Sequence, residues 1–232
     1  MAKRTKIEQE IEINSETEGL EELTIEDLLN EAAQGKQLNL EIAKVNADYA
    51  FRFGLDLASC TISLTEAIEE GIFGWFDAAV QQLESLGTER ITLRLFSPGG
   101  CIDEACAIIG RMRNIKRVGE DGKPVPVPVD VEVYGACYSA ATLILASATG
   151  ERRMSEFADF MWHEGSGGTV GRESELRDYA ERMSHIENRW CEWMARFTKK
   201  PKKFWLDLSK SRKDCYFSAE ECRKMGVCDK VF

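Results

Sequence analysis

Ser139, a serine at a predicted turn, is the residue from which a catalytic interpretation of this chain begins. Ser139 lies between an alternating apolar segment, Val127 to Val133, and an apolar run, Ala141 to Ala148, with small residues in between. This pattern predicts a strand, a tight turn and a buried helix, with Ser139 at the turn. Backbone N–H groups at a helix start favour a developing negative charge, as a serine nucleophile requires. Serine is also a common N-cap, which is the simpler interpretation.

Acyl transfer by a serine also needs a base, two N–H donors for the oxyanion, and a group that orients the base. His163 is the better of the two histidines, because His185 falls on the polar side of a predicted long helix. Gly99 and Gly100, in the turn Ser97–Pro98–Gly99–Gly100, offer unhindered N–H groups at another predicted helix start. Taken alone, this turn and the glycines after His163 are also typical of ordinary loops. Three downstream carboxylates are candidates for the orienting group: Asp207, Asp214 and Asp229.

The elements that must position these residues follow from hydrophobic periodicity. Two units of strand, turn and helix, with strands at residues 60–64 and 91–96, predict a parallel sheet with crossover helices. Residues 119–128 are predicted to be a Gly/Pro loop, and residues 199–203 a basic linker. A long helix is predicted from about Glu173 to Lys199. Its apolar seam repeats every three or four residues and suits either a core or a subunit contact: Leu176, Tyr179, Met183, Ile186, Trp190, Trp193 and Phe197.

Composition limits the class of protein. The 232 residues are 44% hydrophobic, which is enough for one domain with a substantial core. The net charge is −10, and residues 1–50 carry twelve acidic against five basic side chains, so we expect no nucleic-acid partner. No apolar run approaches the roughly 20 residues of a membrane span, and the start lacks a signal sequence, so we expect no membrane partner and a cytoplasmic location. Eight cysteines without a C-x-x-C pair, and only two histidines, predict reduced thiols and no metal site.

Several ordered motifs together resemble the proteolytic subunit of the caseinolytic (Clp) protease family. They are S-P-G-G at 97–100, G-A-C-Y-S-A-A at 135–141, G-E-R-R-M at 150–154, W-H-E-G-S-G-G at 162–168 and K-D-C-Y-F-S-A-E-E at 213–221. The likeness covers roughly residues 55–232, and motifs in this order are far more specific than any one alone.

This resemblance implies an α/β, crotonase-like fold of repeated ββα units (residues 51–232) with a protruding helical handle at about 163–200. Residues 1–50 precede the likeness and exceed the short N-terminal loops of the family; from their Glu-rich composition we expect an acidic, partly mobile extension. By position, Ser139 matches the nucleophile, His163 the general base and Asp214 the aspartate that orients it. Gly100 and Ala140 match the donors of the oxyanion hole. A substrate peptide would lie extended along further matching positions: Gly99, Cys101 and a strand containing Gly165, Gly167 and Gly168.

The resemblance also implies function and partners. We expect a serine endopeptidase without a cofactor that forms heptameric rings stacked as a tetradecamer, the handles meeting at the equator, and receives unfolded polypeptides from an ATP-driven AAA+ unfoldase. Tyr138, Glu164 with Gly165, and Phe96 depart from the family pattern, in which a small residue, a Gln-Pro pair and a polar residue are usual. Two alternatives remain: a non-catalytic ring subunit of a mixed Clp-type complex, and a coenzyme A enzyme of the crotonase fold.

Overall fold

The computed structural model describes residues 34–35, 40–48, 50 and 54–232. The chain divides into two units, residues 1–45 and 46–232. In the first unit the described residues are helical, and Lys44 and Glu41 form an exposed ion pair of 2.9 Å. Most of the predicted extension, residues 1–50, therefore lies outside the described residues. Among the helices that the structure describes, none is both long enough and apolar enough to cross a lipid bilayer.

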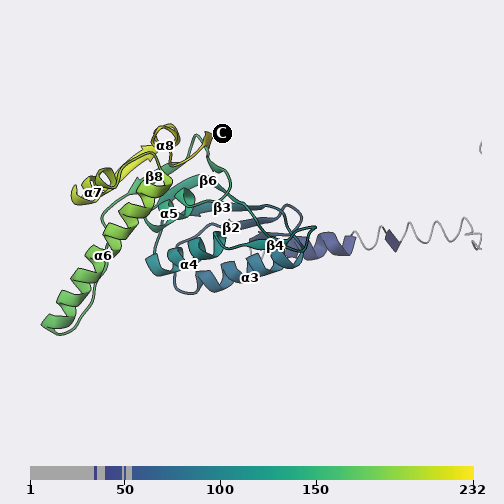
Figure 1. The fold of residues 1–232 in the computed structure, drawn as a ribbon, viewed down its shortest axis with the longest axis horizontal. Coiled ribbons are helices and arrows are strands. Elements are labelled where there is room, and N and C mark those ends of the chain that lie inside the picture. The colour runs from purple at the N-terminus through teal and green to yellow at the C-terminus, as the bar shows by residue number, and fades with distance from the viewer. Residues whose placement is uncertain (1–33, 36–39, 49, 51–53) are drawn as a thin grey trace, which may run out of the picture. The chain divides into compact units, whose positions relative to one another are not determined.

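An eight-stranded sheet organises residues 46–232 (Figure 1). Strands β2, β3, β6, β7 and β10 lie side by side and run parallel, while β1 and β9 pair antiparallel with β2 and β8. The parallel order agrees with the crossover topology predicted from the sequence. The bounds of the strands are β1 Leu55–Asp56, β2 Thr61–Leu64, β3 Ile91–Ser97, β6 Val129–Tyr138, β7 Arg152–Met154, β8 Asp159–Trp162, β9 Cys215–Ser218 and β10 Lys230–Val231.

Strand β6 is long enough to pair with two strands on the same side. Its first half, Val131–Val133, pairs with β7, and its second half, Ala136–Tyr138, pairs with β8. The sequence predicts a strand that ends near Val133 and a turn of small residues around Ser139, but the structure continues the strand to Tyr138, so that the chain turns at Ser139. This extension brings the end of β6 beside the end of β8.

The helices cover the sheet through apolar faces. In α3, a stripe of apolar side chains is buried, at Phe76, Ala79, Val80 and Leu83, and α5 is buried along its whole length. Spacing of three and four residues places such side chains on one face of a helix, and their burial drives the packing. The bounds are α3 Ile72–Ser85, α4 Ile102–Met112, α5 Ala140–Ala146, α6 Glu173–Phe197, α7 Lys202–Lys210 and α8 Ala219–Met225.

Three elements differ from the sequence-based predictions. The predicted loop, residues 119–128, contains the strand β5 (Pro124–Pro126), which forms a hairpin with β4 (Lys116–Val118) just before the loop. Only residues 199–201 of the predicted basic linker lie outside a helix. Helix α7 begins at Lys202, with Pro201 at its N-cap, and packs on the core through Trp205, which is fully buried. Residues 163–172 form neither helix nor strand, where the resemblance implies a glycine-rich strand.

Helix α6 extends beyond the other elements of residues 46–232 (Figure 1). Its C-terminal half packs against the core through Trp190, Cys191 and Met194, while most side chains in its first ten residues are exposed. Leu176, in the predicted apolar seam, is 45% exposed. One part of the seam therefore lies in the core of this chain, and the other part remains uncovered by it.

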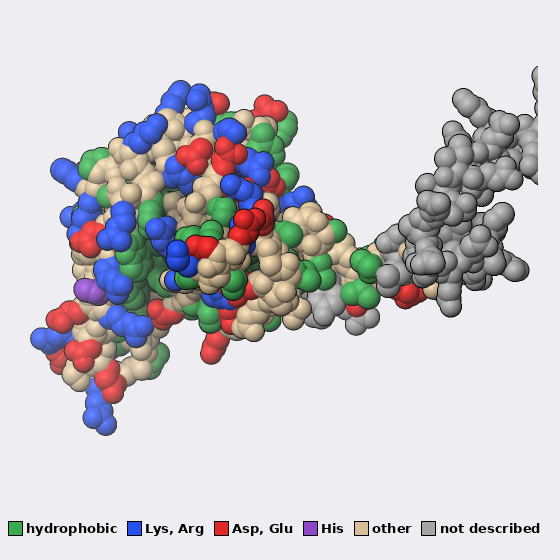
Figure 2. Space-filling model, turned by 45° about the vertical axis from the view of Figure 1, so that its right-hand side comes forward, with side chains coloured by type: hydrophobic (Ala, Val, Ile, Leu, Met, Phe, Trp, Pro, Cys, Tyr) green, Lys and Arg blue, Asp and Glu red, His purple; other side chains and the backbone are tan. Residues whose placement is uncertain are grey.

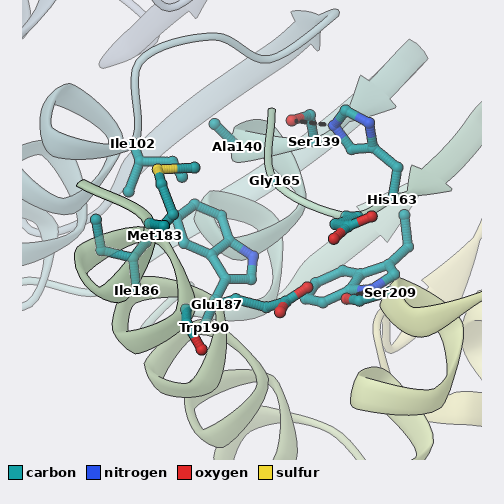
Figure 3. A pocket seen from close by; sticks show the side chains of 14 residues that line it. Ile102, Ser139, Ala140, His163, Gly165, Met183, Ile186, Glu187, Trp190 and Ser209 are labelled. Atoms are coloured by element: carbon teal, nitrogen blue, oxygen red, sulfur yellow. Dashed lines mark hydrogen bonds between the residues drawn. The ribbon is translucent and has the colours of Figure 1, made fainter. Parts of the chain in front are cut away.

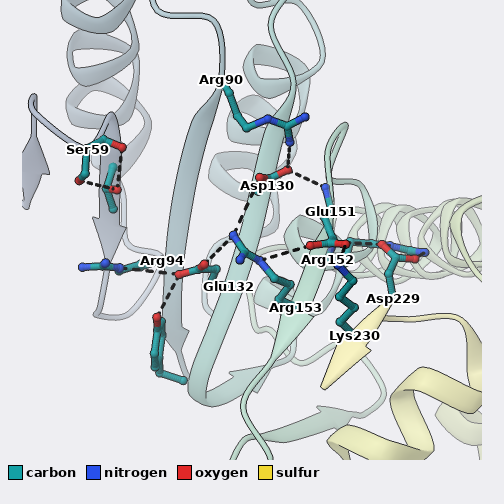
Figure 4. Close-up of polar contacts among 12 residues, drawn as sticks. Ser59, Arg90, Arg94, Asp130, Glu132, Glu151, Arg152, Arg153, Asp229 and Lys230 are labelled. Carbon is teal, nitrogen blue, oxygen red and sulfur yellow. Dashed lines mark hydrogen bonds and ion pairs between the residues drawn. The ribbon is translucent and has the colours of Figure 1, made fainter. Parts of the chain in front are cut away.

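A network of charged side chains ties β6 to β7 and the C-terminus (Figure 4). Asp130, buried on β6, accepts hydrogen bonds from Arg90 at 2.6 Å and from the N–H of Glu151 at 2.7 Å. Arg152 donates two hydrogen bonds to the carboxylate of Asp229, which lowers the pKa of that carboxyl. Asp229 is therefore engaged by Arg152 in this network.

Figure 2 shows acidic and basic side chains interspersed over the face that it presents.

Candidate active site

The turn at Ser139 holds its hydroxyl away from the helix that follows. Ser139 has φ 52° and ψ −122°, a region that non-glycine residues rarely adopt. Its N–H donates to the carbonyl of Met161 at 3.0 Å, and its carbonyl accepts from the hydroxyl of Thr142 at 2.6 Å. The side chain makes no capping hydrogen bond, although Ser139 occupies the N-cap of α5. The N-cap interpretation therefore does not account for this serine.

The pairing of β6 with β8 brings the histidine to the serine. Tyr138 lies opposite Met161 in this parallel pair. Ser139 and His163, which follow the ends of β6 and β8, are therefore close together. The Nε2 atom of His163 lies 2.7 Å from the Oγ atom of Ser139 (Figure 3). This distance is that of a good hydrogen bond between a hydroxyl and a ring nitrogen. The imidazole can therefore take the hydroxyl proton directly.

The pairing of β8 with β9 selects among the three carboxylates. Trp162 lies opposite Cys215, so Asp214 follows on beside His163, and its Oδ1 atom lies 3.7 Å from Nδ1 of the ring. Asp207 instead forms an ion pair with Lys203 at 2.6 Å, and Asp229 binds Arg152. Asp214 is the candidate that faces the ring. The contact is longer than a hydrogen bond, and the Asp214 side chain is 57% exposed.

The glycine turn lies directly against the serine. Gly99 and Gly100 have φ values of +90° and +145°, and a Cβ on Gly99 would lie 2.6 Å from Cβ of Ser139. Ile68 holds this turn, because its N–H donates to the carbonyl of Gly99 and its carbonyl accepts from the N–H of Cys101. The N–H of Gly100 takes part in neither of these two hydrogen bonds. Ala140, the first residue of α5, likewise has an N–H that no carbonyl within the helix can accept.

A pocket of about 340 Å³ opens beside Ser139 and His163 (Figure 3). One wall is the middle of α6, which contributes Met183, Ile186, Glu187 and Trp190. The other residues that line the pocket are Ile102, Ser139, Ala140, Trp162, His163, Glu164, Gly165, Ala180, Ser184 and Ser209. The pocket is mainly apolar, with polar groups near the serine, as is typical of sites that bind organic ligands.

The predicted peptide-binding glycines are separated in the structure. Gly165 lines the pocket, whereas Gly167 lies against the hydroxyl of Tyr179 on α6. The position of a Cβ on Gly168 has no other atom within 4 Å. Within the described residues, no group of three or more His, Cys, Asp and Glu side chains is arranged to hold a metal ion.

A comparison with known families matches one family over most of the chain. The family model described as Clp protease matches residues 53–232, which is most of the chain and includes every residue of the site. The chain belongs to the Clp protease family. Membership confirms the resemblance inferred from the ordered motifs and supports a Clp-type proteolytic subunit.

Three residues of this Clp protease chain distinguish its site. Tyr138, before the serine, packs edge-on against Tyr216 with ring centroids 5.8 Å apart, so its bulk is taken up between β6 and β9. Phe96 covers Gly135, where a Cβ would lie 2.8 Å from the ring. Glu187 lines the pocket, although the sequence analysis does not predict it. It lies one residue after the seam position Ile186, and the heptad-like pattern does not distinguish it from the exposed glutamates of the helix.

Proposed function

We propose that this Clp protease subunit is a serine endopeptidase that acts through Ser139, His163 and Asp214. The Oγ atom of Ser139 attacks the carbonyl carbon of a peptide bond while Nε2 of His163 accepts its proton. The N–H groups of Gly100 and Ala140 stabilise the resulting oxyanion. The C–N bond then breaks, the amine leaves with the proton from His163, and an ester to Ser139 remains. Water hydrolyses this ester with His163 again as the base.

The observation that carries the proposal is the 2.7 Å separation of Ser139 Oγ and His163 Nε2. A hydroxyl without a capping role, held in a sparsely populated backbone conformation and facing an imidazole, is typical of an activated nucleophile. Asp214 acts in this proposal by attracting the Nδ1–H group and the imidazolium that forms during the reaction.

Assembly and partners follow from the family rather than from a single chain. We propose heptameric rings stacked as a tetradecamer, with the exposed half of α6 as the handle that meets its counterpart in the other ring. Leu176, an exposed apolar side chain in this half of the helix, is consistent with such a contact. Unfolded polypeptides would enter from an AAA+ unfoldase and lie extended beside residues 99–101 and 165–168, bound mainly through main-chain hydrogen bonds.

The alternative is a non-catalytic ring subunit, and one distance favours it. At 3.7 Å, His163 Nδ1 and Asp214 Oδ1 are too far apart for a hydrogen bond. A subunit without turnover could keep this looser arrangement.

A fluorophosphonate probe separates the two functions because it reacts only with an activated serine. We expect covalent labelling of the full chain, lost in Ser139→Ala and strongly reduced in His163→Ala. Ser147→Ala is the matched control, since Ser147 is a buried serine at the other end of α5 and donates to the Ile144 carbonyl. An unlabelled wild-type chain, in an assembly whose native mass corresponds to complete rings, would support the non-catalytic subunit.

A further inference from the structure

The pocket beside Ser139 and His163 is apolar in its walls and acidic in its charge. Five large apolar residues line it: Ile102, Trp162, Met183, Ile186 and Trp190. Two carboxylates, Glu164 and Glu187, line it as well, and no Lys or Arg is among the described residues around it. A neutral apolar ligand would use the walls only. A long side chain that ends in a cation would use both features.

The carboxylate of Glu187 is incompletely paired. In Figure 3 its side chain runs from α6 toward Ser209. Its Oε1 atom is buried and accepts no hydrogen bond, and no described residue forms an ion pair with it. Burying part of a carboxylate without a donor costs free energy, which an incoming cation recovers. An ion pair formed here is also less screened than one on the surface.

The basic residues of α6 do not supply that cation. Arg182 binds Asp103 at 3.3 Å, and the guanidinium of Arg189 lies over the ring of Trp193, 4.7 Å from its centroid. Ser209, at the end of the pocket toward which Glu187 points, already accepts a hydrogen bond from Trp162. Within the described part of the chain, the acidic end of the pocket therefore has no positive partner of its own.

We propose that this pocket selects substrates with Lys or Arg on the acyl side of the scissile bond, and that Glu187 determines this specificity. The proposal rests on the proposed peptidase function. Ser139 and Ala140 line the pocket. The substrate residue whose carbonyl carbon Ser139 attacks therefore has its side chain next to the pocket. The methylene groups of that side chain pack on Met183, Ile186 and Trp190, and its cation meets Glu187.

Two fluorogenic peptides test the selection directly. They are identical except for lysine or norleucine on the acyl side, which have nearly the same length and differ in the ammonium group. We expect the kcat/KM of the wild-type chain for lysine to exceed that for norleucine by roughly tenfold or more. In Glu187→Gln, which keeps the shape and removes the charge, this ratio falls by roughly 10- to 100-fold. Glu181→Gln, an exposed change on the same helix, leaves the ratio as in wild type.

The outcomes of this experiment separate the inference from the proposed function. Fluorophosphonate labelling of Ser139 with a wild-type ratio near or below one overturns the selection and leaves the peptidase intact. A chain that is not labelled overturns both. A ratio that is unchanged in a labelled Glu187→Gln chain removes Glu187 as the determinant. The wild-type ratio requires no substitution, so the selection is tested even if the variant folds poorly.

Discussion

Replacing Gly99 by alanine tests whether the glycine turn and the serine turn form one packed unit. A Cβ at this position would lie 2.5 Å from the carbonyl oxygen of Tyr138, 2.6 Å from Cβ of Ser139 and 2.9 Å from the nitrogen of Ala140. Ordinary contacts begin near 3.4 Å, so the two turns must separate by close to 0.9 Å. Positive φ at Gly99 adds about 1–2 kcal/mol of backbone strain for any other residue.

The consequences for activity and stability can be estimated separately. A displacement of about 1 Å at reacting groups can lower a rate about 100-fold, so kcat/KM for a peptide substrate should fall by roughly that factor. Strain and overpacking together should lower the free energy of unfolding by about 2–4 kcal/mol. In a chain of this size, that corresponds to a melting temperature lower by roughly 5–15 °C.

Peptide hydrolysis and thermal unfolding of Gly99→Ala measure both effects, with Gly74→Ala as the matched control. Gly74 lies inside α3 with no atom near its Cβ position, so alanine there should raise the stability by about 0.5–1 kcal/mol without affecting activity. A Gly99→Ala chain that cleaves peptide and unfolds as the wild type does would refute the close packing of the two turns.

Two further substitutions test the elements that support the site. Arg111 binds Asp77 and Glu84 at 2.6 Å, and these hydrogen bonds lower the pKa of both carboxyls. Arg111→Gln should therefore cost on the order of 2 kcal/mol near pH 7. The loss should shrink as the pH falls below about 4, where the carboxyls bind protons first in the unfolded state and, at lower pH, in the folded wild type as well. Equal losses at pH 7 and pH 3 in urea unfolding would contradict this. Phe160, which is fully buried on β8 two residues before Trp162, packs near Trp205. Phe160→Ala should lower the free energy of unfolding by about 3–5 kcal/mol and weaken Ser139 labelling. A loss of stability under 1 kcal/mol would contradict the role of this packing in supporting the site.

Much of the fold was predictable because local periodicity reflects burial directly. Alternating valines predicted β6, and apolar residues spaced by three and four predicted α6. The elements that were missed, the hairpin at residues 116–126 and the helix α7, carry prolines and lysines whose local signals conflict with their packing.

The sequence by itself determined which residue types could act, and the tertiary structure decided which of them meet. Ser139 and His163 could be chosen from local pattern and from the scarcity of histidines, but the residues alone left Asp207, Asp214 and Asp229 open. The registers of β6 with β8 and of β8 with β9 bring Asp214 to the ring. Such registers depend on many hydrogen bonds and side-chain contacts between distant segments, and no single stretch of sequence encodes them. The same holds for Glu187, a helical glutamate whose Oε1 atom only folding buries, in the pocket that Ser139 also lines.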